Sequence, residues 1–412
     1  MGDNVQAVLG GLYQVRDGVE ALYRDLHAHP ELGFQAHRTA GRVAEELRAC
    51  GYEVTGGLGT TGVVGTLSRS AGPTVLLRAD MDALAVREAT GLPYASTVTA
   101  EQPVMHACGH DVHVACLVGF AELMARATGA WEGTVVVLFQ PSEENGDGAQ
   151  AMIDDGLTTA VPTPDVALAQ HVLLYPAGYV GTRSGSFLSA ADSLRVTLHG
   201  RGAHGSAPQA SVDPVVMAAM IVVRLQTVVS RELAAATPAV LIAGSLRAGT
   251  GPNLIPDHAV LELNVRTYDT EVREQVLASV ERIVRAEARA SGSPAEPEFE
   301  HLAHFPPTVN DQATTETVAR AFADHFGSDA RTIDRQTASE DMSDIPAAFG
   351  IPFTYWGIGG IDPAAHAAAE RNGTVAADIP VNHSPTFAPV LQPTLDTGVR
   401  ALTAAAMAWL GR

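Results

Sequence analysis

The segment Thr134–Phe139, with the sequence TVVVLF, constrains the fold of this chain most strongly because it is almost wholly apolar. A strand of this composition is typical of a sheet that is covered on both faces. A similar run occupies Thr74–Ala79, while Val5–Cys50 and Asp111–Ala127 have the spacing of helices. Alternating strands and helices predict an α/β fold with a mostly parallel sheet and helices on both of its faces.

The middle of the chain follows a different pattern. Strand-like and helical segments occur there in the order β-α-β-β-α-β, over Ser193–Leu198, Asp213–Arg231, Ala239–Leu246, Val260–Val265, Thr270–Ser291 and Glu296–Glu300. This order is the ferredoxin-like α+β arrangement. We therefore predict a discontinuous α/β domain over residues 1–190 and 303–412, with an inserted ferredoxin-like domain over residues 191–302.

The C-terminal part of the chain returns to the α/β pattern. Helical spacing covers Val318–Phe326 and Leu391–Leu410, and Pro352–Trp356 is strand-like. The alanine-rich segment Pro363–Ala377 is locally biased in composition, so it is predicted to be a surface loop.

Charge and cysteine usage disfavour several classes of protein. The 412 residues carry 26 basic and 46 acidic side chains, a net charge of −20 that disfavours binding to nucleic acid or to anionic lipid. Three scattered cysteines are too few for a disulfide framework. The N-terminus lacks a signal-peptide pattern, and the longest apolar stretch, Val215–Val229, is too short to span a bilayer. These features predict a soluble, cytoplasmic protein.

The segment MHACGHDVH, residues 105–113, contains the densest group of metal-binding residue types. Cys108 and His110 lie two residues apart, with a glycine between them, just before a predicted helix. A thiolate and an imidazole at this spacing can converge on one cation from a loop. The alternative is a buried cysteine followed by a helix that Asp111 caps. Taken alone, the spacing leaves both interpretations open.

Two adjacent carboxylates, Glu143 and Glu144, directly follow the apolar strand. Neighbouring acids repel one another unless a cation is close, and their position after a buried strand favours a site over a solvated loop. One carboxylate can then bind metal while the other acts as a general base. His171 and His383 add single histidines at a predicted strand end and in a loop. Each alone is as well explained by a structural role, but four such sites in one chain indicate a metal centre.

The inserted segment adds further polar side chains. His204 lies in the glycine-flanked loop RGAHGSAP, Asn253 lies in GPNLIP, and Arg266 ends a predicted strand. A histidine or asparagine can donate a hydrogen bond to an oxyanion, and an arginine can bind a carboxylate through two hydrogen bonds. Turn formation and a surface ion pair are the structural alternatives for Asn253 and Arg266.

Taken together, these motifs resemble the binuclear metal-dependent amidohydrolases, which include aminoacylases, hippurate hydrolase and the indole-acetyl-amino-acid hydrolases. The resemblance is carried by HAHPELGFQ (27–35), LRADMDAL (77–84), MHACGHDVHVA (105–115), FQPSEE (139–144), AQHV (169–172), GRGAHGSAP (200–208), NLIPD (253–257), SEDM (339–342) and NHSPTFAP (382–389). The motifs occur in the family's order and cover nearly the whole chain. Within the family, the chain is most similar to the bacterial aminoacylases that act on N-acyl amino acids.

The resemblance implies two divalent metal ions per subunit, Zn²⁺ or Mn²⁺ with Co²⁺ as a third alternative, bound by Cys108, His110, Glu144, His171 and His383. It implies Glu143 as the general base, Asp82 as an acid that orients the site, and His204 as the oxyanion donor in its own subunit or a partner's. Asn253 and Arg266 would hold the substrate carboxylate. The inserted domain would serve as a lid and as the surface of a homodimer or homotetramer.

The predicted reaction is hydrolysis of the amide bond of an N-acyl amino acid by a water molecule that the metal ions activate and Glu143 deprotonates. A dipeptidase or carboxypeptidase of the same family is the alternative, since it differs only on the acyl side of the bond. A non-catalytic, metal-stabilised binding protein and a hydrolase with Cys108 as its nucleophile are further alternatives.

Overall fold

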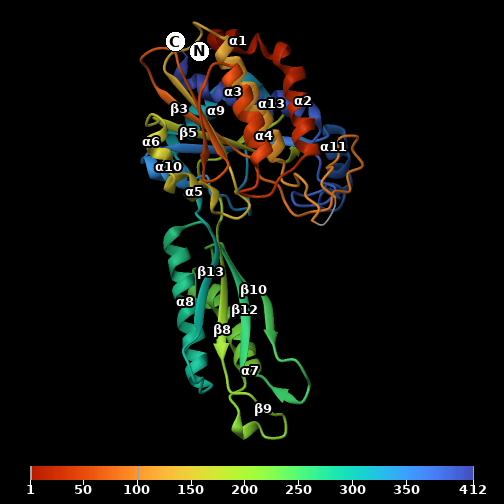
Figure 1. The fold of residues 1–412 in the computed structure, drawn as a ribbon, viewed down its shortest axis with the longest axis vertical. Coiled ribbons are helices and arrows are strands. Elements are labelled where there is room, and N and C mark those ends of the chain that lie inside the picture. Colours follow the sequence, from red (N-terminus) through yellow and green to blue (C-terminus); the bar gives the residue numbers. More distant parts are fainter. Residues whose placement is uncertain (1, 100–101, 412) are drawn as a thin grey trace. The chain divides into compact units, whose positions relative to one another are not determined.

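The computed structural model describes residues 2–99 and 102–411, and the chain forms two compact units. The first unit comprises the chain up to Phe187, Val309–Arg335 and the chain from Asp341 onward, and the second comprises Leu188–Thr308 and Gln336–Glu340 (Figure 1). The segment predicted as the inserted domain lies within the second unit. Residues 336–340 also belong to that unit, although no periodicity in the sequence marks them.

An eight-stranded sheet organises the first unit, in the order β1-β2-β4-β3-β5-β16-β6-β15. Its four central strands run parallel, whereas the β1–β2, β2–β4 and β16–β6 pairs are antiparallel. The largely parallel central sheet is therefore confirmed. The strands are β1 (Glu53–Leu58), β2 (Gly62–Ser68), β3 (Thr74–Asp80), β4 (Thr134–Gln140), β5 (Val166–Pro176), β6 (Val180–Thr182), β15 (Ala330–Thr332) and β16 (Phe353–Ile361).

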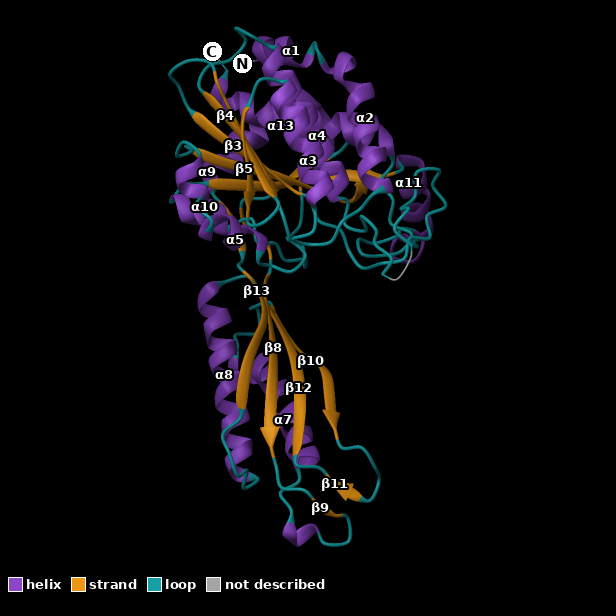
Figure 2. Ribbon diagram, in the orientation of Figure 1, coloured by secondary structure: helices purple, strands orange, loops and turns teal. Residues whose placement is uncertain are grey.

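Helices cover both faces of this sheet, as the apolar strands predict (Figure 2). A Cβ atom on Gly65 of β2 would lie 2.9 Å from Leu47 on one face, and a Cβ atom on Gly62 would lie 2.8 Å from Met152. Successive side chains of a strand point to opposite faces of the sheet, so Gly62 and Gly65 face opposite sides. Leu47 of α3 therefore covers one face and Met152 of α5 covers the other. The helices are α1 (Gly2–Leu9), α2 (Leu12–Ala28), α3 (His37–Ala49), α4 (His110–Arg126), α5 (Gly148–Asp154), α6 (Leu157–Ala160), α9 (Gln312–Phe326), α10 (Asp344–Phe349) and α13 (Leu391–Leu410).

The alanine-rich segment at 363–377 is helical, so the prediction of a surface loop there is wrong. It forms α11 (Pro363–Asn372) and the start of α12 (Val375–Asp378). The side chain of Asp362 accepts a hydrogen bond from the amide of Ala365, and Gly373 ends the helix in the left-handed conformation. Alanine is the strongest helix former. The alanine-rich composition of this segment therefore favours a helix with normal caps and not a loop.

The second unit has the predicted β-α-β-β-α-β order. Its antiparallel sheet runs β10-β12-β8-β13, and the two helices pack on it around a core of their own. The elements are β8 (Ala190–His199), α7 (Pro214–Thr227), β10 (Ala239–Ala248), β12 (His258–Thr267), α8 (Thr270–Ala290) and β13 (Glu298–Phe305). Two short ladders complete the fold, β9 (Ala203–His204) with β11 (Leu254–Ile255) and β7 (Gly185–Leu188) with β14 (Thr308–Asn310).

Helix α7 and the π-helical turn after it span Pro214–Glu232, 19 residues. By length and composition alone, this is the one helix among the described residues that is long and apolar enough to cross a membrane. However, Met217, Ile221 and Leu225 are buried in the core of the second unit. The helix therefore has the buried face expected of a helix that packs within a folded domain.

Candidate metal centre

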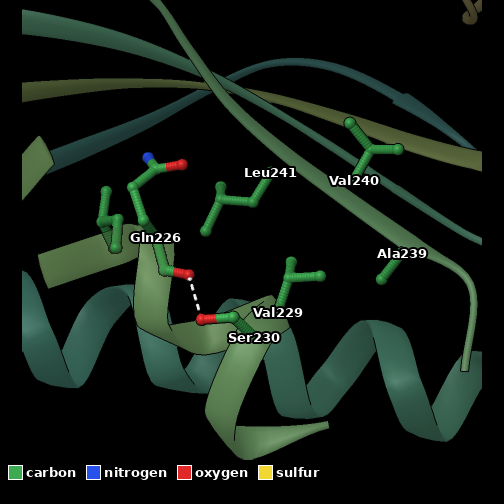
Figure 3. A pocket seen from close by; sticks show the side chains of 7 residues that line it. Gln226, Val229, Ser230, Ala239, Val240 and Leu241 are labelled. Atoms are coloured by element: carbon green, nitrogen blue, oxygen red, sulfur yellow. Dashed lines mark hydrogen bonds between the residues drawn. The ribbon is translucent and has the colours of Figure 1, made fainter. Parts of the chain in front are cut away.

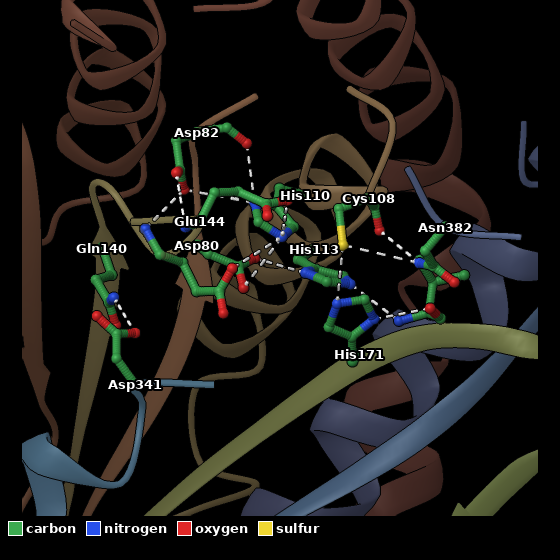
Figure 4. Close-up of polar contacts among 12 residues, drawn as sticks. Asp80, Asp82, Cys108, His110, His113, Gln140, Glu144, His171, Asp341 and Asn382 are labelled. Atoms are coloured by element: carbon green, nitrogen blue, oxygen red, sulfur yellow. Dashed lines mark hydrogen bonds and ion pairs between the residues drawn. The ribbon is translucent and has the colours of Figure 1, made fainter. Parts of the chain in front are cut away.

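The carboxyl ends of the central strands bring distant segments of the chain together. β3 ends at Asp80, β4 ends at Gln140 directly before the loop that carries Glu143 and Glu144, and β5 carries His171. In an open parallel sheet these ends form one edge, where ligands bind. The loop before α4 and the loop that carries His383 reach the same place, as the contacts of Cys108 show (Figure 4).

All five predicted metal ligands converge in this part of the first unit. The donor atoms of Cys108, His110 and His171 lie within 4.8 Å of one another, and so do those of Cys108, Glu144 and His383. The Cys108 sulfur is 3.5 Å from Nε2 of His171, and Nε2 of His383 is 3.4 Å from Oε1 of Glu144. Cys108 thus belongs to two overlapping groups of sulfur, nitrogen and oxygen donors, which is a set of ligands that suits zinc or manganese.

Unpaired buried atoms indicate that this arrangement fits a cation. Nε2 of His110 and Oε1 of Glu144 are buried, and within the described part of the chain neither has a hydrogen-bond partner. The two atoms are 3.9 Å apart. Buried polar atoms are normally paired, and an exception calls for an explanation such as a bound ion.

Hydrogen bonds from the backbone hold the ligands in place. Nδ1 of His110 is 2.9 Å from the main-chain oxygen of Asp82, and Nδ1 of His171 is 2.7 Å from that of Val172. In both residues Nε2 is the nitrogen that remains to face a metal. The amide of His383 donates to the oxygen of Ala107 at 2.7 Å, which ties its loop to the one that carries Cys108.

Local backbone geometry also serves the site. α4 starts after Gly109, whose φ of +86° is in the left-handed region. A Cβ atom there would lie 2.4 Å from Val172, so only glycine fits between the two ligand-bearing segments. Asp111 lies inside the first turn of the helix and does not occupy the capping position, which argues against the alternative of a helix that Asp111 caps. His383 itself has a positive φ of 68°, a strained conformation of the kind that clusters at functional sites.

The donor groups shift one another's pKa values. The neighbouring Cys108 and Glu144 raise the pKa of His383 to about 10. Burial lowers the pKa of His110, but the charges of Asp80 and Cys108 raise it by more, so it lies well above its usual value. Burial, reinforced by nearby histidines, lowers the pKa of His171 well below its usual value. Protons and a cation compete for these lone pairs, so metal binding would displace protons from His110 and His383.

Glu143 and Asp82 lie beside the candidate ligands and make different contacts. One carboxylate oxygen of Glu143 is 3.7 Å from Nε2 of His110. The two carboxylate oxygens of Asp82 accept hydrogen bonds from the amides of Glu143 and Glu144, at 3.0 and 3.1 Å. Asp82 therefore points at the backbone that carries the two glutamates, which is the contact expected of an orienting acid.

The three predicted site residues of the second unit are not brought together. His204 pairs with Leu254 in the β9–β11 ladder, beside Asn253 and near the start of β12. Arg266 lies near the other end of that strand, where it donates to the oxygen of Thr337 and to the hydroxyl of Ser339. An extended strand of this length separates the two ends by roughly 25 Å. Within one copy of the chain, Asn253 and Arg266 therefore cannot hold the same carboxylate, and their joint role stays a prediction that requires two copies of the chain.

A buried network that no spacing in the sequence marks lies beside the candidate ligands. Asp80 is paired with Arg78 at 2.7 Å, and Arg78 donates to Gln140. Asp80 is also paired with His113 at 2.6 Å, and Asp341 accepts from Gln140 (Figure 4). All five side chains are essentially excluded from solvent. These residues lie in the motifs LRAD, HDVH, FQ and SED. Their place in these motifs was therefore the one feature of the sequence that pointed to them.

A second buried cluster lies on the other side of Asp111. Nδ1 of His27 is 2.6 Å from Asp111, and its Nε2 is 3.2 Å from Glu88. Burial lowers the pKa of His27, but hydrogen bonds with the two carboxylates raise it by more, to about 10. His27 therefore carries a proton at neutral pH and ties α2 to the start of α4. Its only signal in the sequence was its place in HAHPELGFQ.

The second unit contains a separate hollow, between α7 with its π-helical turn and β10 (Figure 3). Its lining consists of Leu225, Gln226, Val229, Ser230, Ala239, Val240 and Leu241. These side chains include no acid, base or metal ligand, and the hydroxyl of Ser230 donates to the main-chain oxygen of Gln226 at 2.9 Å with no base beside it, so the hollow is not a candidate catalytic site.

Comparison with known proteins identifies close relatives. The model of "Peptidase family M20/M25/M40" matches residues 76–380. Thermostable carboxypeptidase 1 of Saccharolobus solfataricus is 35% identical over 323 residues, 77% of this chain and 80% of that protein. N-acetyl-L-cysteine deacetylase of Bacillus subtilis is 36% identical over 73% of this chain and 71% of its own, and hippurate hydrolase of Campylobacter jejuni is 35% identical over 75% and 79%.

Solved structures share the fold over almost the whole chain. A proposed aminohydrolase from methicillin-resistant Staphylococcus aureus has a TM-score of 0.85 and 29% identity, with 98% of both chains covered. The YXEP protein of Bacillus subtilis, described as a dinuclear metal-binding peptidase of the M20 family, has a TM-score of 0.76 and 27% identity. That match covers 96% of this chain and 98% of the other.

Proposed function

Because this chain belongs to the M20/M25/M40 peptidase family, we propose that it hydrolyses the amide bond of an N-acyl amino acid, releasing a carboxylic acid and a free amino acid. Family membership confirms the resemblance drawn from the motifs and the prediction of a metal-dependent amidohydrolase. The observation that carries the proposal is the convergence of five metal-binding side chains beside the carboxyl group of Glu143, one oxygen of which is 3.7 Å from Nε2 of His110.

The proposed cofactor is a pair of divalent ions, Zn²⁺ or Mn²⁺, with Co²⁺ as a third alternative. Cys108, His110, Glu144, His171 and His383 would hold them, with Cys108 common to both groups of donors. When bound, such ions polarise the amide carbonyl and lower the pKa of a water molecule from about 15.7 towards about 7.

The remaining steps belong to side chains of this protein. Glu143 accepts a proton from the attacking water and delivers it to the departing nitrogen, while Asp82 holds the backbone of Glu143 in place. His204 stabilises the oxyanion. Its Nδ1 accepts a hydrogen bond from the amide of Ser206 at 3.2 Å, so in the neutral ring Nε2 carries the proton that can be donated.

We assign recognition of the substrate carboxylate to Arg266, whose guanidinium is only partly engaged by its contacts within the second unit. Asn253 lies beside His204, so it would act in the same site as that residue, in its own subunit or a partner's. A guanidinium binds a carboxylate through two parallel hydrogen bonds, which would favour substrates with a free carboxyl group.

The proposed assembly is a homodimer, or a homotetramer built from it, through the second unit. β10 is an edge strand that pairs only with β12 among the described strands. Val240 and Ile242 on β10 and Val223 and Met220 on α7 expose 40–70% of their surface, and unpaired strand edges with apolar neighbours are pairing surfaces. With few cysteines and no disulfide, we place the protein in the cytoplasm.

A panel of substrates tests this function. Metal-loaded protein is expected to hydrolyse N-acetyl and N-benzoyl amino acids with a kcat/KM at least about tenfold above that for dipeptides of the same C-terminal residue and above that for their carboxamides. The released amino acid is measured. Faster turnover of dipeptides would establish the carboxypeptidase alternative. The 35% identity to thermostable carboxypeptidase 1 of Saccharolobus solfataricus is similar to the identity to hippurate hydrolase, so identity alone does not choose between the two reactions. No turnover of any member would sink the proposal.

Mixing two inactive variants tests whether His204 acts in the partner's site. His204→Ala is expected to lower kcat by about 10²- to 10³-fold, the usual loss of an oxyanion donor. If His204 serves the partner, dimers formed from His204→Ala and Glu143→Ala subunits contain one intact site, and an equal mixture recovers about a quarter of wild-type activity. Recovery after subunit exchange is measured against each variant alone. Absence of recovery in verified heterodimers would place His204 in its own subunit's site.

A further inference from the structure

His113 is the buried residue that most directly connects two of the proposed metal ligands. It lies one helical turn after His110 on α4 and is 1% exposed. Its ring centroid is 4.5 Å from that of His171, at 70° between the ring planes, and 5.4 Å from that of His110, at 30°. His113 therefore packs against the rings of both proposed ligands.

Both nitrogens of His113 are occupied. The amide of Val172 donates to Nε2 at 2.9 Å, so Nε2 is an acceptor and the ring proton sits on Nδ1. Nδ1 donates to Oδ1 of Asp80 at 2.6 Å. With no lone pair left, His113 is not itself a ligand, although its atoms lie near those of Asp80 and His110.

The anchor on the Asp80 side is rigid. Asp80 is fully buried at the end of β3, and its second oxygen accepts from Nη1 of Arg78 at 2.7 Å. Nε of Arg78 donates in turn to Gln140 at the end of β4, at 2.9 Å. The proton on His113 is therefore held by a charged pair on β3, which Gln140 of β4 supports. Rotating the ring by 180° would place a hydrogen against the amide of Val172.

The contact on the other side fixes the end of β5. Val172 directly follows His171, and its side chain fills the space above two glycines. A Cβ atom on Gly109 or on Gly360 would come within 2.4 or 2.5 Å of it. The hydrogen bond to His113 thus fixes the position of the His171–Val172 peptide relative to the start of α4, which carries His110.

We propose that His113 is a positioning residue that sets the mutual orientation of His110 and His171 and thereby the affinity of the centre for its cations. This inference rests on the proposed metal-dependent function. Residues that orient metal-ligating histidines commonly contribute about 10- to 100-fold in metal affinity. His113 acts through hydrogen bonds to Asp80 and to the amide of Val172, and it touches neither metal nor substrate.

Two substitutions separate the two hydrogen bonds of His113. Asparagine can place an amide donor near the position of Nδ1 and so keep the bond to Asp80, whereas glutamine can place a carbonyl near the position of Nε2 and so accept from Val172. Leu123→Ala is the matched control, because Leu123 is equally buried on α4 but ten residues along the helix, about 15 Å away. All variants are checked for folding by circular dichroism and thermal unfolding.

The readout is the dissociation constant for Zn²⁺ and Co²⁺, measured by competition with a chromogenic chelator in the absence of substrate. We expect His113→Asn and His113→Gln to bind metal about 10- to 100-fold more weakly than wild type, while Leu123→Ala stays within about twofold. The Co²⁺ absorption bands of both His113 variants should shift as the ligand geometry changes, and those of Leu123→Ala should not.

Wild-type affinity and spectra in folded His113→Asn and His113→Gln would overturn the inference. Equal weakening in Leu123→Ala would do so too, since the effect would then be general loss of packing. A wild-type protein that binds metal in a His113-dependent way but turns over no N-acyl amino acid would refute the proposed function and support the positioning role.

Discussion

Replacing Glu143 with glutamine is expected to lower kcat by about 10²- to 10⁴-fold, the usual contribution of a general base, while KM changes little. Glutamine has nearly the same shape but cannot take a proton from water. The backbone amide of Glu143 would keep its hydrogen bond to Asp82, so the loop should stay in place. The measurement is steady-state hydrolysis of an N-acyl amino acid, together with the metal content of the purified variant.

Glu144→Gln is the matched comparison because the two residues are adjacent and share the same anchor on Asp82. Glu144, with its unpaired buried oxygen beside His383, is assigned to the metal, so its variant should lose bound metal together with activity. If Glu143→Gln is the variant that loses metal, the two glutamates have exchanged roles. If both variants keep metal and activity, neither role is right.

Removal of the metal ions is expected to abolish hydrolysis, and restoring Zn²⁺, Mn²⁺ or Co²⁺ is expected to return it. The proposed metal ligands come from four separate segments of the chain. Without the ions, the attacking water keeps a pKa of about 15.7, whereas a metal-bound water has a pKa near about 7. Activity is followed during dialysis against a chelator and during titration with each ion. The ion that gives the highest kcat/KM at its measured stoichiometry identifies the working metal.

The same experiment separates this reaction from thiol chemistry. A hydrolase that used Cys108 as its nucleophile would keep its activity in the presence of a chelator. The contacts of Cys108 favour the metal interpretation, since its sulfur lies within the reach of His110, His171, Glu144 and His383 and accepts from the side chain of Asn382 at 3.8 Å. Full activity after exhaustive removal of metal would overturn the proposed mechanism.

The order of the strands and helices could be predicted largely from apolar patterning. The runs at β3 and β4, the spacing of α4 and the β-α-β-β-α-β order of the second unit follow from local periodicity, which is a property of neighbouring residues. The error at Pro363–Asn372 has the same local origin, because alanine-rich composition was taken as a sign of irregular structure although alanine favours a helix.

The network around Asp80 could not be predicted in the same way. Asp80 and His113 are 33 positions apart, and Arg78 and Asp341 are 263 apart, so no spacing in the sequence relates them. Nor does a pattern mark residues 336–340 as part of the second unit, where they are held by Arg266 and Ser189. Such pairings depend on which strand ends meet, and that is settled only when the sheet forms.

The sequence by itself determined which residues could bind metal and which family's motifs they form, because residue chemistry and motif order are written along the chain. Only the tertiary structure decided that Cys108 belongs to two donor groups, that Asp82 faces the backbone of the glutamates, and that Asn253 lies beside the β9–β11 ladder while Arg266 lies near the far end of β12. The physical reason is that coordination and hydrogen bonding act over a few ångströms in space, whatever the separation in sequence.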